Sequence, residues 1–137
     1  MPMEQTPASA GVGPAAWRVL AATQGIYFAL TGVWPVVHIP SFMLVTGPKT
    51  DLWLVRLVGA MITVVGVILL DAARRGRLDR GVWGLGFWMP VVLGTVDVVY
   101  VINQTIPPVY LLDAVAEAAI AAWWLGVLAA KRKRGAG

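Results

Sequence analysis

The chain has 137 residues, of which 58% are hydrophobic and only 13% are charged, whereas a soluble domain carries about 25% charged residues. Its net charge of +4 comes without a nucleic-acid-binding fold or aromatic platform, so we interpret the basic residues as membrane topology determinants and expect no nucleic-acid partner. The sequence contains no cysteine, which excludes disulfides, thiolate metal sites, iron–sulfur clusters and CxxC redox chemistry.

Four continuous apolar stretches predict an all-α integral membrane protein. They cover approximately residues 16–37, 52–70, 82–102 and 109–130, and each is close to the 20 residues that cross a hydrocarbon core of about 30 Å. Continuous rather than alternating hydrophobicity excludes a membrane barrel. We therefore expect a four-helix membrane bundle over residues 16–130, a disordered segment at residues 1–15 and a basic tail at residues 131–137.

Basic residues predict the orientation of the bundle. They crowd the connection between the second and third stretches (Arg74, Arg75, Arg77, Arg80) and follow the fourth stretch at positions 131–134, whereas only Lys49 lies outside the membrane on the other side. Positive charge favours the cytoplasmic side. Both termini are therefore expected in the cytoplasm, with the chain crossing a bacterial inner (plasma) membrane several times.

The first stretch has a polar face that is predicted to point into the bundle. Gln24, Thr31 and His38 are spaced by seven residues along it. Pro35 favours a kink or an early end of the helix. The following segment, residues 39–45, reads IPSFMLV and is apolar for an exposed loop, so it is expected either in the membrane interface or folded over the bundle as a lid.

The second stretch combines a charged residue with a face of small residues. Arg56 lies four residues inside Leu52, roughly 6 Å into the membrane. It could extend to the interface, but a carboxylate partner inside the bundle is the favoured interpretation. Arg56, Gly59, Ala60, Thr63 and Gly66 share one face, and its small residues would let a neighbouring backbone approach closely.

The third stretch places an acid and a proline within the membrane. Asp97 lies near its outer end, with Tyr100 beside it at helical spacing. Pro90 should bend the helix by freeing the carbonyl of Gly86. Such a bend is compatible either with a wet cavity or with an ordinary packed kink.

The fourth stretch carries two acids one helical turn apart, Asp113 and Glu117. Glu117 lies nine residues from Pro108, roughly 13 Å deep, and its side chain is too short to reach the interface. Glu117 is therefore the first candidate for a functional residue.

Together these positions predict a polar cluster in the outer half of the bundle. Its members would be Arg56, Asp97 and Asp113, with Glu117 and Gln24 deeper and with His38 and Tyr100 near the mouth. Three acids against one arginine lead us to expect at least one protonated acid at neutral pH. The cluster is interpreted either as a proton or cation site or as a structural network in which Arg56 bridges Asp97 and Asp113.

Four short-looped helices, a second helix reading RLVGAMITVVGVILL and an aromatic, polar first helix resemble the DoxX-like group of small bacterial membrane proteins. The resemblance covers most of the chain in hydropathy. It implies a four-helix membrane bundle, sometimes associated with quinone-linked redox systems, and it assigns no functional residue.

The sequence favours a ligand-binding or transport-like membrane protein that takes a proton or a small cationic or polar solute, with transport requiring a dimer. One alternative is a non-catalytic accessory subunit of a larger membrane complex. Another is a membrane enzyme acting on a lipid or quinone-like substrate, with Glu117 or Asp97 as acid or base, although no catalytic motif is present. A lone histidine and the lack of ligand spacing predict no metal site, and no cofactor is expected beyond a possible quinone or lipid.

Overall fold

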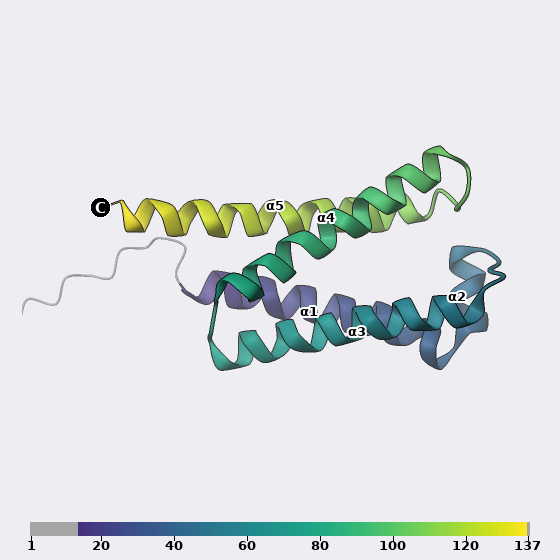
Figure 1. The fold of residues 1–137 in the computed structure, drawn as a ribbon, viewed down its shortest axis with the longest axis horizontal. Coiled ribbons are helices and arrows are strands. Elements are labelled where there is room, and N and C mark those ends of the chain that lie inside the picture. Colours follow the sequence, from purple (N-terminus) through teal and green to yellow (C-terminus); the bar gives the residue numbers. More distant parts are fainter. Residues whose placement is uncertain (1–13, 137) are drawn as a thin grey trace, which may run out of the picture.

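The computed structural model describes residues 14–136, which form five helices and no strand (Figure 1). The helices are α1 (Pro14–Val37), α2 (Ile39–Thr46), α3 (Leu52–Arg75), α4 (Arg80–Ile102) and α5 (Tyr110–Gly135). All except α2 are long and apolar enough to cross a membrane. The all-α prediction with four candidate spans is thus confirmed. Most of the segment expected to be disordered, residues 1–13, lies outside the described residues.

Two of the long helices continue beyond the apolar runs that predicted them. Helix α3 ends at Arg75 rather than near Leu70, and α5 continues through most of the basic segment that was expected to be a tail. Arginines in the last turn of a helix interact favourably with its dipole, and Arg75 also pairs with Asp71 at 2.9 Å. Apolar run length therefore marks the part of a helix that can lie in lipid, not the whole helix.

Helix α2 occupies the segment that was expected to be an apolar loop or lid. The side chain of His38 accepts a hydrogen bond from the backbone N–H of Ser41 and so caps the start of this helix. Gly47 ends it with a φ of 86°. The helix lies across one end of the bundle, which we call the α2 end (Figure 1).

Helices α1 and α3 pack closely because glycines on both helices face each other. A Cβ atom added to Gly32 would lie 2.5 Å from the carbonyl oxygen of Gly59, and one added to Gly66 would lie 2.7 Å from the carbonyl oxygen of Gly25. Backbone contact of this kind is typical of membrane helix pairs. The predicted packing role of Gly59 and Gly66 is confirmed.

Helices α4 and α5 form a second pair, and the two pairs diverge along the molecule. A buried cluster joins the two pairs toward the end that holds the C-terminus (Trp17, Leu20, Ala21, Leu69, Ala73, Trp124, Val127). From there α4 runs obliquely away from α1 and α3, so the pairs separate toward the α2 end (Figure 1).

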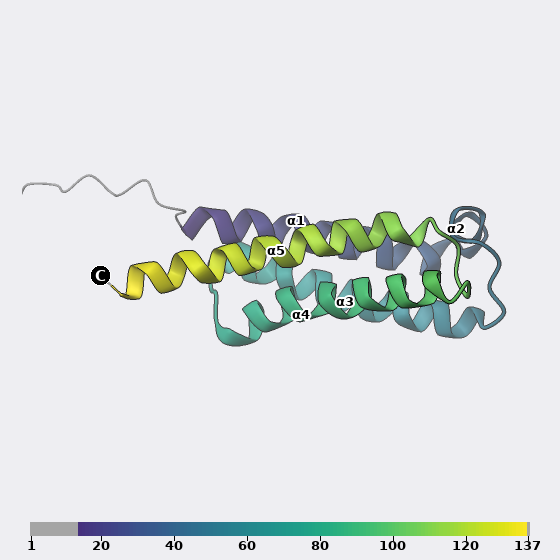
Figure 2. The same cartoon turned by 90° about the horizontal axis from the view of Figure 1, so that it is seen from above.

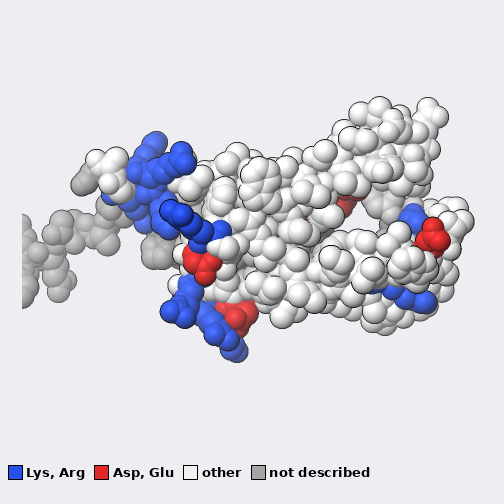
Figure 3. All heavy atoms as spheres, viewed as in Figure 1, with Lys and Arg blue, Asp and Glu red and all other residues white. Residues whose placement is uncertain are grey.

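Positive charge gathers at the end opposite α2, which we call the basic end (Figure 3). The start of α1 and the C-terminus both lie there (Figures 1 and 2). Arg18 at this end donates hydrogen bonds to the carbonyl oxygens of Ala73 at 2.8 Å and Arg74 at 3.3 Å. The two ends of the bundle therefore differ sharply in charge.

Candidate functional site

A cavity of about 480 Å³ lies between the two helix pairs at the α2 end. All five helices contribute to its wall, and the space-filling view shows a hollow on this part of the molecule with an acidic side chain inside it (Figure 3). Most of the wall is apolar, and it includes five aromatic side chains (Tyr27, Phe28, Trp34, Phe42, Tyr110). The divergence of the pairs thus leaves an aromatic-lined chamber.

Three carboxyl groups lie in this wall, from two different helices. Asp97 comes from α4, whereas Asp113 and Glu117 come from successive turns of α5. Glu117 can lie close against α4 because Gly94 has no side chain there: a Cβ atom on Gly94 would be 3.3 Å from the Cβ atom of Glu117. The structure therefore brings together the three acids of the predicted polar cluster.

The three acids differ in how well their oxygens are satisfied. The hydroxyl of Tyr27 donates a hydrogen bond to Oδ1 of Asp113. Asp97 is 8% exposed and Glu117 is 1% exposed, and Oδ2 of Asp97 and Oε2 of Glu117 are buried without a hydrogen-bond partner among residues 14–136. Buried polar atoms are almost always paired, so an unpaired buried oxygen calls for an explanation, and a functional role is one.

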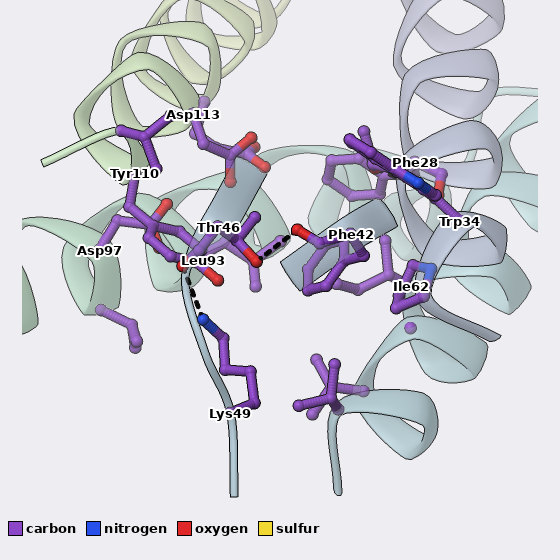
Figure 4. A pocket seen from close by; sticks show the side chains of 18 of the residues that line it. Phe28, Trp34, Phe42, Thr46, Lys49, Ile62, Leu93, Asp97, Tyr110 and Asp113 are labelled. Carbon is purple, nitrogen blue, oxygen red and sulfur yellow. Dashed lines mark hydrogen bonds between the residues drawn. The ribbon is translucent and has the colours of Figure 1, made fainter. Parts of the chain in front are cut away.

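Lys49 lies at the edge of the cavity, close to Tyr110 and below Asp97 and Asp113 in the close-up (Figure 4). Its ammonium donates hydrogen bonds to the carbonyl oxygens of Thr46 at 2.8 Å and Gly47 at 3.2 Å, and it lies 5.3 Å from the centroid of the Tyr110 ring. Among the described residues that line the cavity, Lys49 is the only basic one. The wall therefore carries three carboxyl groups and one ammonium.

Gln24 belongs to the packed core rather than to the cavity, which corrects its predicted place in the cluster. Its side chain is fully buried, donates a hydrogen bond from Nε2 to the carbonyl oxygen of Gly86 at 2.9 Å, and accepts one from the indole of Trp124 at 2.6 Å. The carbonyl of Gly86 needs this donor because Pro90, four residues later, has no N–H. The carbonyl that Pro90 frees is therefore satisfied within the packed core by Gln24.

The remaining predicted members do not line the cavity. Arg56 is exposed, and no ion pair joins it to an acid within residues 14–136, so the hypothesis that it bridges Asp97 and Asp113 is wrong. The cavity face of α3 is occupied by aliphatic side chains instead. His38 is exposed and caps α2, and Tyr100 is exposed on α4.

Sequence reasoning did not select two polar residues of this wall, Tyr27 and Lys49. Tyr27 lies three residues after Gln24 on the polar stripe of α1, which was a usable signal for a residue facing the bundle. Lys49 gave no such signal, because it lies in a turn whose path depends on α2. Within the described residues, no three acidic or histidine side chains are arranged to hold a metal ion.

Comparison of the chain with protein-family models, with curated proteins and with solved structures finds no significant match in any of the three. The DoxX-like resemblance therefore stays a prediction, and the functional argument depends on the cavity itself.

Proposed function

We propose that this chain is a multi-pass membrane protein that binds a proton or a small cationic or polar ligand at the acids of its cavity, in a transport-like or ligand-binding role. The observation that supports this most directly is the unpaired state of two buried carboxyl oxygens, on Asp97 and Glu117, in the wall of one cavity. Ionisable groups inside membrane segments mark proton relays and cation sites.

The charge of the wall favours a positive occupant. Asp97, Asp113 and Glu117 face a single ammonium, that of Lys49, which is already hydrogen-bonded to two backbone carbonyls. Buried like charges repel strongly where few counter-charges are available. A bound cation or a proton relieves that repulsion, and the two can exchange for each other.

The charge asymmetry of the bundle supports the proposed orientation. The basic end carries the arginines of the α3–α4 connection and the basic residues at the end of α5, which favour the cytoplasmic face of a bacterial inner membrane. Both termini are then cytoplasmic, and the cavity lies in the outer half of the membrane.

A second groove supports the alternative of an accessory subunit. It has a volume of about 390 Å³, runs along α4 and α5, and is lined by small residues that include Gly94, Ala114, Ala118 and Ala121. Such surfaces suit close docking of a partner helix. In that role the chain would bind another membrane protein along this face.

Infrared difference spectroscopy on the protein in lipid nanodiscs tests the proposed site. We expect a carboxyl band that titrates with pH, that responds to an added cation such as methylammonium, and that is lost in Glu117→Gln. Asp79→Asn is the matched control, because Asp79 is an exposed acid that caps α4 outside the cavity. A spectrum that responds to neither pH nor cation, together with a Glu117→Gln variant that is merely less stable, would show that the acids have a structural role instead.

A further inference from the structure

We propose that the occupant of this cavity is a lipophilic organic cation, with its positively charged head against the acids and its apolar body against the aromatic wall, which enters from the bilayer between α3 and α4. This inference rests on the proposed function and names its ligand class and route.

Two observations indicate the chemistry of the ligand head: the acids in the wall, and the fact that no three side chains among the described residues are arranged to bind a metal ion. Asp97, Asp113 and Tyr110 lie on one side of the cavity (Figure 4). Inorganic divalent cations need several oxygens converging on one point, and no such group of three side chains exists among residues 14–136. Carboxyl groups beside aromatic faces instead suit an ammonium or another organic cation.

Lys49 shows how this wall receives an ammonium. Its head group lies against two backbone carbonyls and 5.3 Å from the ring centroid of Tyr110. A ligand head would find the same combination of oxygens and aromatic rings deeper in the cavity, where Oδ2 of Asp97 and Oε2 of Glu117 have no partner among the described residues.

The apolar body of the ligand is defined by the opposite wall and by the volume. Phe28, Trp34, Phe42 and Ile62 lie across the cavity from the acids (Figure 4). A volume of about 480 Å³ falls within the range of roughly 300–1,000 Å³ typical of sites for drug-sized ligands. It greatly exceeds the roughly 30 Å³ that one water molecule occupies. A bare ammonium ion would leave this aromatic surface uncovered.

The route is defined by which parts of the wall reach the surface. Three lining residues of the cavity are exposed, all of them aliphatic: Leu54 and Val58 at 44% each on α3, and Val96 at 45% on α4. Both helices are candidate membrane spans, so these side chains meet lipid. The lining residues from α1, α2 and α5 are buried or half-buried. The cavity is therefore open to the bilayer between α3 and α4.

Three probes on the unaltered protein in nanodiscs test the ligand class, with empty nanodiscs subtracted. Tetraphenylphosphonium carries the charge and the apolar body, tetraphenylborate has the same shape with the opposite charge, and tetramethylammonium has the charge without the body. We expect saturable binding of tetraphenylphosphonium, none of tetraphenylborate, and binding of tetramethylammonium at least about tenfold weaker.

Each other outcome overturns a definite part of the proposal. Equal binding of both tetraphenyl ions would mean hydrophobic partition and would refute the cation site. Equal affinity for the two cations, with a carboxyl band that still responds, would refute the lipophilic ligand and leave the proposed function standing. Binding of neither cation, with unchanged carboxyl spectra, would overturn both.

The route is tested by narrowing the opening. Val58→Trp places a large side chain between α3 and α4, and we expect it to slow the association of tetraphenylphosphonium by about tenfold. Val64→Trp is the control, because Val64 is 58% exposed on the same helix and does not line the cavity. Equal association rates in the two variants would refute entry between α3 and α4.

Discussion

Replacement of Gln24 with leucine tests how helix α4, which contains Pro90, is held in the bundle. Gln24 is fully buried and makes two hydrogen bonds, to the carbonyl oxygen of Gly86 at 2.9 Å and from the indole of Trp124 at 2.6 Å. Leucine has a similar size but offers neither a donor nor an acceptor. Gly86 cannot recover a helical hydrogen bond, because the residue four positions later is Pro90.

The structure predicts how much Gln24→Leu destabilises the protein and how that cost depends on Pro90. Leaving a buried partner unsatisfied costs about 1–3 kcal/mol, and measured interhelical hydrogen bonds in membranes fall toward the lower end. With two partners orphaned, we expect Gln24→Leu to lower the free energy of unfolding by about 2 kcal/mol. In a Pro90→Ala background the restored N–H can satisfy Gly86, so the same change should cost about 1 kcal/mol.

Unfolding in mixed detergent micelles, followed by tryptophan fluorescence and far-ultraviolet circular dichroism, measures this double-mutant cycle. The effect of Pro90→Ala on its own cancels, because the cost of Gln24→Leu is measured within each background separately. Thr95→Val is the control, because the Thr95 hydroxyl is exposed and bonds only to its own helix at Val91; its effect should stay within about 0.5 kcal/mol. An equal cost of Gln24→Leu in both backgrounds would show that Gln24 does not replace the hydrogen bond that Pro90 removes.

Three further predictions follow from the packing and the charges. Gly32→Ala should destabilise the protein by about 1–3 kcal/mol in the same unfolding assay, because the added Cβ would lie 2.5 Å from the carbonyl oxygen of Gly59. Gly84→Ala, whose Cβ would meet nothing within 4 Å, should be neutral or stabilising by up to about 1 kcal/mol, and similar losses in both variants would contradict the proposed helix contact. Lys49→Gln should raise the affinity for tetraphenylphosphonium about tenfold in nanodisc binding, since it removes a like charge from the cavity wall; a weaker affinity would mean that the ammonium shapes the mouth. Acidification should weaken tetraphenylphosphonium binding while circular dichroism stays unchanged, because protons compete for the carboxylates, and affinity that is flat with pH would count against those acids as the cation site.

The sequence predicted features that depend on distance along the chain. Run length identified four helices, and the spacing of Asp113 and Glu117 placed them on one face of α5, toward the cavity. The pattern of Gly59 and Gly66 likewise indicated a contact face, and α1 packs there. Depth in the membrane and side-chain periodicity are local properties, so a single sequence is enough to obtain them.

Features that depend on the rotation of a helix about its axis could not be obtained in this way. Arg56 has the right depth to meet the acids, but the face of α3 that lines the cavity carries Leu54, Val55, Val58 and Ile62. The rotation of α3 about its axis is fixed by the contact of its glycines with α1. Similarly, the partner of Gln24 depends on where α4 crosses α1, which no local pattern specifies.

The buried Gln24 amide and the buried acids of the cavity differ in their hydrogen bonding, and this difference favours a ligand site over a purely structural role for the acids. In the packed core, the amide nitrogen and the amide oxygen of Gln24 are both hydrogen-bonded, as a structural network in lipid requires. At the α2 end, Asp97 and Glu117 each bury an oxygen that has no partner among residues 14–136, although an arginine lies on the adjacent helix. If these acids served only to stabilise the fold, pairing them would raise the free energy of unfolding, because an unpaired buried polar group is destabilising. Two buried carboxyl oxygens without a partner in the described part of the chain, beside an apolar cavity that opens toward lipid, are accounted for when these acids bind a molecule that enters and leaves.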